Sequence, residues 1–536
     1  MKHLYSFLLS ALLCLSLSAQ NKVSGDSLAA DFHYLVKQLE AAHPDPYTGF
    51  GGKVFFHKQA FDLENELRSQ PHTLQEFWDK SMAFLSFIQD GHTYLFSLAP
   101  KQQQEQSYLP VGFRCIPDGL IVQSLLAAHQ DLLGSLLIGI NGKSMDELLV
   151  RTASLFACEN LYNRYSVFCR NVGRKQFMQQ LLPDLEDTVC LNLRTPDGKE
   201  VTLEQHFMEN EDLRKAEKVS LPSWEGCPEE QMAYRFIDKK KEVMMFKVNS
   251  IMARDNFEYM YKYMKGDLLR QMEFYYQNAL KKEMPADTLQ AIRALPSFSG
   301  TFAAMLKEMK KHHSEYLIID LRGNSGGWTP IVLASLYQLY GDKYLQKDMD
   351  TEYYRIVSPL YMNKLEITLE EFNRRYGTDY SFGGYTFSMK EQEDVPLDTL
   401  RRQFIDGCMS SVKEELRAQK GAPVYAPKQV FVVTDERTFS AAFHYAFMLW
   451  KMGATVVGVP SGQAPNTFME QTLFKLPYTG IEGSISNSVQ IFLPGKDKRA
   501  KTFWPDVMLT YDEYKQTGFD KQAEILFLLN KIGQEK

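Results

Sequence analysis

Val430-Phe-Val-Val-Thr434-Asp-Glu-Arg-Thr-Phe-Ser440-Ala-Ala442 places a serine between a strand-like run and an apolar helical run at residues 443–452. A second strand-like run, residues 454–458, follows the helix. This order predicts an α/β unit. Free N–H groups and the positive end of the helix meet at Ser440, which suits stabilisation of an anion and therefore acyl chemistry. The alternative is an ordinary helix-capping serine.

A second stretch, Leu317-Ile-Ile-Asp320-Leu-Arg-Gly-Asn-Ser-Gly-Gly327, runs from a strand into a glycine-rich turn. One apolar helix face lies before it, within residues 302–309, and a helical run follows at residues 331–340. Consecutive glycines let backbone N–H groups approach a ligand closely. The turn lacks the patterns of phosphate loops, G-x-x-x-x-G-K-[ST] and G-x-G-x-x-G, which favours a loop that donates to an oxyanion.

Three motifs together resemble the C-terminal-processing and tricorn-type serine peptidases. They are residues 320–327, which are similar to a D-L-R-x-N-x-G-G signature, the Ser440 segment, and Trp504-Pro-Asp-Val507. The resemblance covers residues 25 to 515 in patches. It implies a multidomain α+β and α/β protein that ends in an α/β crotonase-like (ClpP-like) catalytic domain.

The resemblance also implies site residues. Ser440 would be the nucleophile, and the N–H groups of Gly326, or Gly327, and of Ala441 would hold the oxyanion. The C-terminal-processing branch uses a lysine after the serine, but residues 460–467 contain none. The tricorn-like branch takes a histidine from a D-x-H-T segment instead.

Asp90-Gly-His92-Thr93 matches that segment, so we expect His92 to be the general base. The alternatives are a structural histidine at position 92 and His444 as the base, although a helix would carry His444 away from the serine. The acid that orients the base is a glutamate in the family. Only Asp497 lies in the corresponding stretch, and Glu470, Glu482 and Asp90 are rivals.

The segment before the catalytic domain predicts a β-rich module. Asn141-Gly142 between apolar runs indicates a tight turn, and residues 136–142 resemble the later half of a PDZ-like module. Such a module holds a peptide at a sheet edge, and the loop of Val111, Gly112 and Phe113 would bind its carboxylate. Residues 145–182 form a helical insertion. The alternative is a β-rich domain without a ligand.

The start of the chain predicts export. Met1-Lys-His3 is basic, residues 4–17 are mainly apolar, and Ser18 and Ala19 offer a cleavage site. This is typical of a secretory signal peptide and too short for a membrane span. We expect a periplasmic, cell-surface or secreted protein without a transmembrane segment.

Composition disfavours other classes. A net charge of −6 without a basic patch argues against nucleic-acid binding. The six cysteines after the signal peptide lack zinc-like spacing, and the histidines lack H-E-x-x-H, so we expect no metal and no cofactor. A Cys158–Cys169 disulfide and free buried thiols are both open.

Five parts are therefore expected. They are a signal peptide (1–19), an N-terminal helical region with the DGHT turn (20–104), the PDZ-like module (105–208), a linker (209–235) and the catalytic domain (236–536). The favoured function is an exported serine peptidase that acts on peptides or unfolded proteins through an acyl-enzyme. The alternative is a catalytically weak or inactive peptide-binding relative. An α/β-hydrolase is disfavoured because the serine segment is not G-x-S-x-G.

Overall fold

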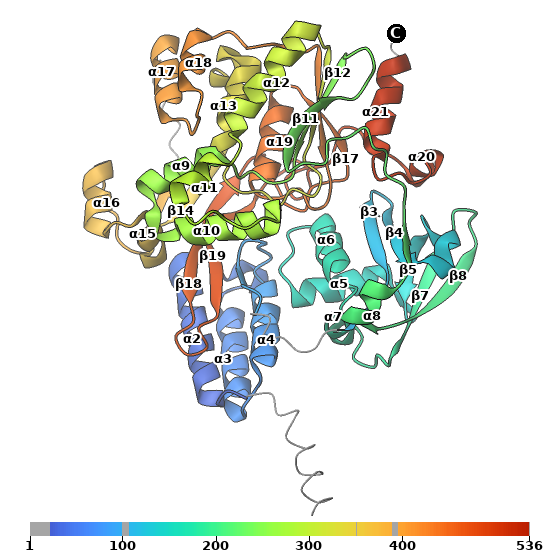
Figure 1. The fold of residues 1–536 in the computed structure, drawn as a ribbon. Helices are drawn as coiled ribbons and strands as arrows, with labels where there is room; N and C mark the ends of the chain where they lie inside the picture. Colours follow the sequence, from blue (N-terminus) through green and yellow to red (C-terminus); the bar gives the residue numbers. More distant parts are fainter. Residues whose placement is uncertain (1–21, 99–106, 350, 388–394, 535–536) are drawn as a thin grey trace, which may run out of the picture.

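The computed structural model describes residues 22–98, 107–349, 351–387 and 395–534, so the expected signal peptide lies outside the described residues. Figure 1 shows three parts: a large upper body, a helical N-terminal region below it and a β-rich module at its side. No helix within the described ranges is both long and apolar enough to cross a bilayer.

A five-stranded sheet forms the centre of the upper body, in the order β11-β12-β13-β16-β17. β11 is antiparallel to β12, and the other neighbours are parallel. Its strands are β11 (Met232–Phe236), β12 (Val243–Val248), β13 (Tyr316–Asp320), β16 (Gln429–Thr434) and β17 (Thr455–Gly458). Leu317 and Ile319 face one core cluster and Ile318 faces another. Burial on both faces explains why these strands read as continuous apolar runs.

Helices cover both faces of this sheet. One core cluster joins the sheet to α12 (Phe298–His312), α13 (Pro330–Tyr340) and α19 (Ala441–Lys451). The other face packs against α20 (Tyr511–Gln516), α21 (Ala523–Gln534) and two isoleucines of the β-rich module. The expected helix–strand–glycine turn–helix order around residue 320 and the strand–serine–helix order around residue 440 are both present.

The remaining helices of the upper body lie between or after these strands. They are α9 (Arg254–Tyr263), α10 (Leu268–Tyr275), the π-helical η5 (Tyr276–Leu280), α11 (Thr288–Arg293), α14 (Asp342–Leu345), α15 (Pro359–Leu365), α16 (Leu369–Tyr376), α17 (Leu397–Gly407) and α18 (Lys413–Ala418).

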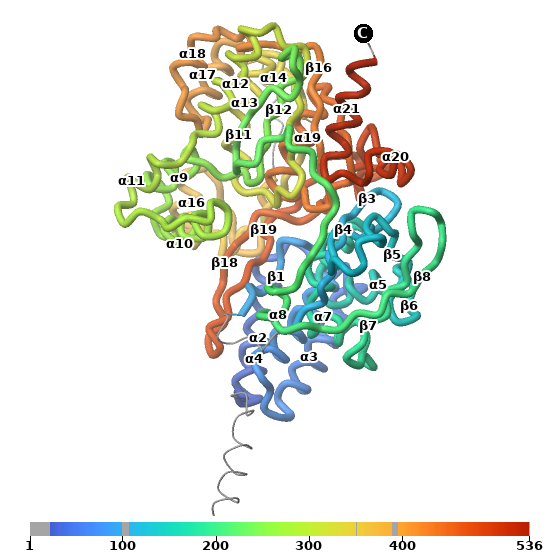
Figure 2. Tube along the Cα trace, turned by 45° about the vertical axis from the view of Figure 1, so that its right-hand side comes forward, coloured from blue at the N-terminus to red at the C-terminus, as the bar shows by residue number. Residues whose placement is uncertain are grey.

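The N-terminal region consists of α2 (Gly25–Ala42), α3 (Lys53–Ser69), α4 (Leu74–Ser86) and the short strand β1 (Tyr94–Leu95). Its helices share a core with the hairpin β18 (Thr467–Lys475) and β19 (Glu482–Ile491) of the upper body. Figure 2 shows this hairpin reaching from the upper body to α2. β1 pairs with β19, so the DGHT turn immediately before β1 is fixed to the sheet that contains this hairpin.

That second sheet has the order β1-β19-β14-β15, and β18 also pairs with β19. Its remaining strands are β14 (Glu352–Ile356) and β15 (Tyr385–Phe387).

The β-rich module contains a seven-stranded sheet and three inserted helices. The strands are β3 (Gly112–Ile116), β4 (Gly119–Leu126), β5 (Leu136–Ile140), β6 (Lys143–Ser144), β7 (Thr188–Arg194), β8 (Glu200–His206) and β10 (Lys218–Ser220). The helices are α5 (Met145–Leu155), α6 (Leu161–Asn171) and α7 (Lys175–Leu181). Asn141 and Gly142 both have positive φ, as the expected tight turn requires.

The stretch expected to be a linker is more structured than its composition indicates. It contains α8 (Asn210–Lys215), and β10 pairs with β4 of the module. The module therefore extends to residue 220, because a short charged strand can complete a sheet edge. All six described cysteines are free thiols, so Cys158 and Cys169 are not bridged.

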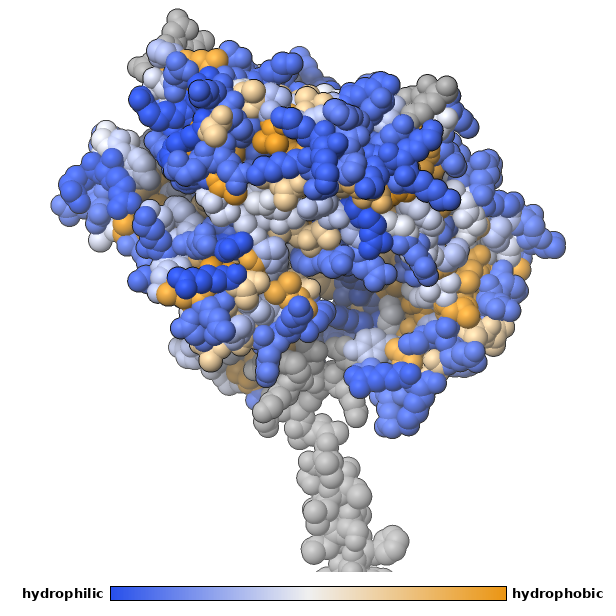
Figure 3. Space-filling view, turned by 45° about the horizontal axis from the view of Figure 1, so that its top comes forward, coloured by the Kyte–Doolittle hydropathy of each residue, from blue (hydrophilic) through white to orange (hydrophobic). Residues whose placement is uncertain are grey.

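The face in Figure 3 is mainly hydrophilic, with apolar residues in small scattered groups. Single exposed apolar side chains are normal on a folded protein, so this face offers no broad apolar contact surface.

Candidate active site

Ser440 stands at the N-terminus of α19 in an unusual backbone conformation. Its φ and ψ are 53° and −127°, and its side chain makes no capping hydrogen bond. Positive φ in a non-glycine residue is strained by about 1–3 kcal/mol and is common at active sites. Its backbone N–H donates to Gln463 Oε1, so the turn is held from outside the helix. The ordinary capping interpretation is therefore wrong, and the hydroxyl is left for chemistry.

The glycine turn packs directly against this serine. A Cβ on Gly326 would lie 2.6 Å from Ser440 Cβ and 2.8 Å from Ala441 N, so only glycine fits. The Gly326 N–H already donates to Asn324 Oδ1 at 2.9 Å. Among the hydrogen bonds of the described residues, none uses the N–H of Gly327 or of Ala441. The N–H of Gly326 is therefore engaged within the turn, while those of Gly327 and Ala441 have no acceptor among the described residues.

The structure brings His92 to the serine segment. Its ring lies 4.9 Å, centre to centre, from the ring of Phe439, the residue before Ser440. Gly91 permits this contact, because a Cβ there would lie 2.6 Å from Phe439 Cζ. No hydrogen bond joins the His92 and Ser440 side chains among the described residues. Catalytic hydrogen bonds often tighten only when substrate binds.

Burial favours the neutral form of His92, which a general base requires. Only 6% of the residue is exposed, and this burial lowers the pKa of His92, against the opposing influence of the Asp90 charge and the nearby Phe468 backbone. Its Nδ1 is buried without a hydrogen-bond partner.

Two carboxyl groups flank that Nδ1. Asp90 Oδ1 and Glu159 Oε1 each lie 3.9 Å from it. Burial alone would raise the pKa of Asp90, but hydrogen bonds from His43 and Thr93 and the charges of His43 and His92 hold it at about 2. Burial and the charge of Asp90 raise the pKa of Glu159 to about 8, against hydrogen bonds from Ala464, Thr467 and Gly91. Of the acids expected near the base, Asp90 is the one in place.

Glu159 was not expected from the sequence. It lies in the α5–α6 loop, residues 156–160 of the β-rich module, and belongs to no recognisable motif. Its approach depends on Gly91, because a Cβ there would lie 3.1 Å from Glu159 Oε1.

The expected acid Asp497 lies elsewhere. Its carboxylate pairs with Arg499 at 2.9 Å, and that guanidinium lies 4.5 Å from the ring centre of Trp450, at the opposite end of α19 from Ser440. The rivals are also engaged, since Glu470 pairs with Arg355 and Lys364, and Glu482 with Lys475.

His444 is a buried structural residue. Its Nδ1 lies 2.8 Å from Thr329 Oγ1, and its Nε2 lies 2.8 Å from Gln490 Oε1. Burial lowers the pKa of His444 to about 4, helped by the nearby His92 and opposed by the bond to Gln490. With both ring nitrogens occupied, His444 has no free atom to accept the serine proton.

A buried ion network connects the glycine turn to α21. Arg322 makes paired hydrogen bonds to Asp320 and a third, of 2.7 Å, to Glu524 of α21. Arg114 of the module also binds Glu524, at 2.7 and 2.9 Å. Burial would raise the pKa of Glu524, but the two guanidinium groups hold it at about 2. The motif aspartate and arginine therefore have a structural role.

Only part of the loop expected to bind a peptide carboxylate, residues 111–113, is accessible. Phe113 is buried in the core of the module, and a Cβ on Gly112 would lie 2.6 Å from Ser124 Oγ. Val111 is partly exposed. Phe113 is thus a packing residue, and Val111 and Gly112 remain predictions.

Asp90, His92 and Glu159 are close enough to hold a cation, because their ligand atoms lie within 4.8 Å of one another. Asp90, however, already accepts from His92 N, Thr93 and His43, and Glu159 accepts from two backbone N–H groups. Both carboxylates are thus already held by protein donors, and we assign no metal to this cluster.

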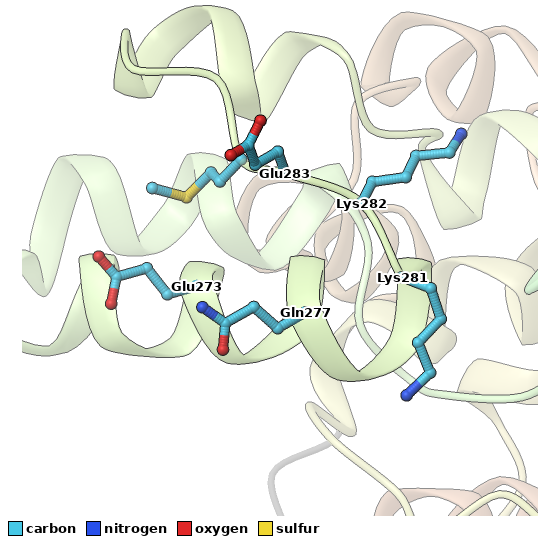
Figure 4. Close-up of a pocket in the computed structure, with 6 residues that line it drawn as sticks. Glu273, Gln277, Lys281, Lys282 and Glu283 are labelled. Atoms are coloured by element: carbon cyan, nitrogen blue, oxygen red, sulfur yellow. The ribbon is translucent and has the colours of Figure 1, made fainter. Parts of the chain in front are cut away.

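A separate hollow lies on the surface of α10 and the turn after it (Figure 4). Its lining residues carry mixed charges and come from one short segment: Glu273, Gln277, Lys281, Lys282, Glu283 and Met284. It contains no residue of the serine, histidine or glycine motifs, so it is distinct from the candidate active site.

Residues 291–482 match the model of peptidase family S41, a range that includes the glycine turn and Ser440. This domain belongs to peptidase family S41. The family consists of serine peptidases, so the chain contains a domain that matches a serine peptidase family. His92 and Glu159 lie outside the matched range, in the N-terminal region and the module.

Solved structures show the same fold over nearly the whole chain. Mature CPAF matches with a TM-score of 0.53 and 15% identity, over 95% of this chain and 98% of that chain. CPAF complexed with lactacystin matches with a TM-score of 0.52 and 15% identity, over 94% and 97%. The photosystem II D1 C-terminal processing protease reaches a TM-score of 0.38 at 10% identity, over 91% and 94%, which is too distant to support an argument. No curated protein matches the sequence significantly.

Proposed function

We propose that this S41 domain cleaves peptide bonds through a Ser440 acyl-enzyme, with His92 as the general base, in an exported protein. The observation that carries the proposal is the strained, uncapped Ser440 beneath the glycine turn, with the His92 ring against the neighbouring Phe439. The apolar start of the sequence supports export.

The chemistry follows from these positions. His92 Nε2 accepts the proton of Ser440 Oγ as the oxygen attacks the peptide carbonyl, and the imidazolium then protonates the leaving amine. The N–H groups of Gly327 and Ala441 hold the oxyanion that forms. Each such donor is worth about 3 kcal/mol of transition-state stabilisation. Water, activated by the same imidazole, releases the acyl group.

The β-rich module is proposed to hold the peptide substrate in a PDZ-like manner. Among the described strands, β3 pairs with β4 alone, which leaves its other edge for a peptide strand. Val111 and Gly112 stand at the start of this edge.

A catalytically weak, peptide-binding relative is the second candidate. The unpartnered Nδ1 of His92 and the absence of a bond between the described His92 and Ser440 side chains favour it. Both candidates use the same fold and differ in turnover.

Labelling with a fluorophosphonate tests the proposal, because this reagent reacts with activated serines. We expect the wild type to label at Ser440 and to hydrolyse unfolded casein, and Ser440→Ala to do neither. Equal labelling of both proteins, or no labelling of a well-folded wild type, would reject the acyl-enzyme. N-terminal sequencing of the exported protein tests cleavage after Ala19.

A further inference from the structure

His92 lacks the partner that a catalytic imidazole needs. For Nε2 to accept a proton, Nδ1 must carry the hydrogen, and a hydrogen bond to Nδ1–H fixes that tautomer and stabilises the imidazolium. In this structure Nδ1 is buried without a partner, although two carboxyl groups lie 3.9 Å away. A movement of about 1 Å by either group would close a normal hydrogen bond.

Asp90 is poorly placed to make that movement. Its Oδ1 accepts from the backbone N–H of His92 at 2.8 Å, and its Oδ2 accepts from Thr93 Oγ1 at 2.5 Å and contacts His43 Nε2 at 3.3 Å. These bonds fix the carboxylate within its own turn. A rotation toward Nδ1 would leave buried donors unsatisfied, at a cost of about 1–3 kcal/mol each.

Glu159 is better placed. Its Oε1 accepts a long hydrogen bond from Gly91 N at 3.3 Å, and the Thr467 side chain also donates to the carboxylate, which still leaves a lone pair for Nδ1. Its Oε2 is anchored by Ala464 N at 2.8 Å. A glutamate side chain has one more rotatable bond than an aspartate, so it can shift toward the imidazole while the anchor is kept.

The α5–α6 loop that carries Glu159 is fixed to the catalytic domain. Besides the bond from Ala464, Asn160 Nδ2 donates to the backbone oxygens of Ser461, at 3.1 Å, and Lys501, at 3.3 Å. Asn163 Oδ1 in turn accepts from Glu159 N. The position of Glu159 therefore depends on how the β-rich module sits on the catalytic domain.

We propose that Glu159 is the positioning residue for His92, supplied by the β-rich module, so that the peptidase is competent only while the α5–α6 loop is docked. The inference rests on the proposed function. The ionised carboxylate accepts from Nδ1–H and leaves Nε2 free for the Ser440 proton, whereas a protonated Glu159 cannot accept in this way.

Protonation of Glu159 adds a pH dependence. The titratable groups that face it are Asp90 and His92, both from the turn before β1, while α6 and the segment before β18 present the neutral Asn163 and Ala464. Burial and the charge of Asp90 raise the pKa of Glu159 to about 8. Activity should therefore rise with pH as Glu159 loses its proton.

The test compares Glu159→Gln with Glu186→Gln, a matched control at an exposed position of the same module. Steady-state hydrolysis of unfolded casein gives kcat and KM, and thermal unfolding reports folding. We expect Glu159→Gln to lower kcat on the order of 10² to 10⁴-fold with KM little changed, as loss of an orienting carboxylate does elsewhere. Glu159→Asp should recover part of this loss, and the control should match the wild type.

The pH profile distinguishes a positioning role of Glu159 from a packing role. It can be measured on the wild type alone if Glu159→Gln does not fold. Wild-type kcat/KM should rise through an inflection near pH 8, and Glu159→Gln should lack it. An active wild type without this inflection, or a folded Glu159→Gln with wild-type kcat, overturns this inference alone. An inert wild type that does not label with fluorophosphonate overturns the proposed function and this inference together.

Discussion

Two buried histidines lie near Ser440, and their surroundings differ. His444 is four residues along α19 and has Thr329 and Gln490 on its two ring nitrogens. His92 comes from the other end of the chain, has an unpartnered Nδ1 and faces two carboxyl groups. Sequence proximity to the serine favours His444, whereas the hydrogen bonds favour His92. A general base needs a free nitrogen, and His444 has none because both of its ring nitrogens are engaged, so closeness along the chain does not identify the base.

The largest effect should come from His92→Ala. Removing the base should lower kcat by about 10⁴-fold or more, because members of a catalytic group act as a unit. Casein hydrolysis and thermal unfolding check this, with Ser440→Ala as the inactive reference. Near-normal turnover in a folded His92→Ala protein would reverse the assignment of the two histidines.

A smaller effect is expected in the pH dependence of the free energy of unfolding, to which His444 contributes. Because burial lowers the pKa of His444 to about 4, the unfolded chain binds its proton first as pH falls below about 6.5. Stability is therefore lost as pH falls from 6.5 to 4, by about 3 kcal/mol from this residue. Urea unfolding of wild type and His444→Gln at pH 7 and pH 4 measures it. An equal loss in both proteins would show that His444 is not the group that titrates.

His444→Gln should affect catalysis less than stability. An amide can replace one or both hydrogen bonds of the ring, so we expect kcat within about tenfold of the wild type and a stability loss of about 1–2 kcal/mol at pH 7. If kcat instead fell as far as it does in His92→Ala, the structural role given to His444 would be wrong.

The smallest effect is expected for Asp497→Asn. Its ion pair with Arg499 is near the surface and far from Ser440, and such pairs contribute about 0–1 kcal/mol. We expect kcat within about twofold of the wild type. A loss comparable to that of Glu159→Gln would restore Asp497 as the acid.

The elements that could be predicted from the sequence are those encoded by neighbouring residues. The strand–glycine turn–helix around Asp320 and the strand–serine–helix around Ser440 are encoded by neighbouring residues, and both formed as expected. Whether Gly326 or Gly327 has a free N–H for the oxyanion depends on the direction of the Asn324 side chain, which a sequence motif does not specify.

Glu159 could not be predicted for a different reason. Its anchor at Ala464 is 305 positions away, and no motif marks the α5–α6 loop. Asp497 was chosen by its offset from the serine, but an offset holds only where the intervening segment keeps its length and path. Residues brought together by the docking of separate parts need coordinates.

The Glu524 network has a consequence for biosynthesis. Arg322 at the base of the glycine turn, which also pairs with Asp320, and Arg114 of the module share one carboxylate in α21. A buried guanidinium without its counter-charge is strongly unfavourable. While the chain is still emerging from the ribosome, the turn next to the reactive serine lacks this carboxylate, so hydrolytic competence should arrive only after α21 has been made.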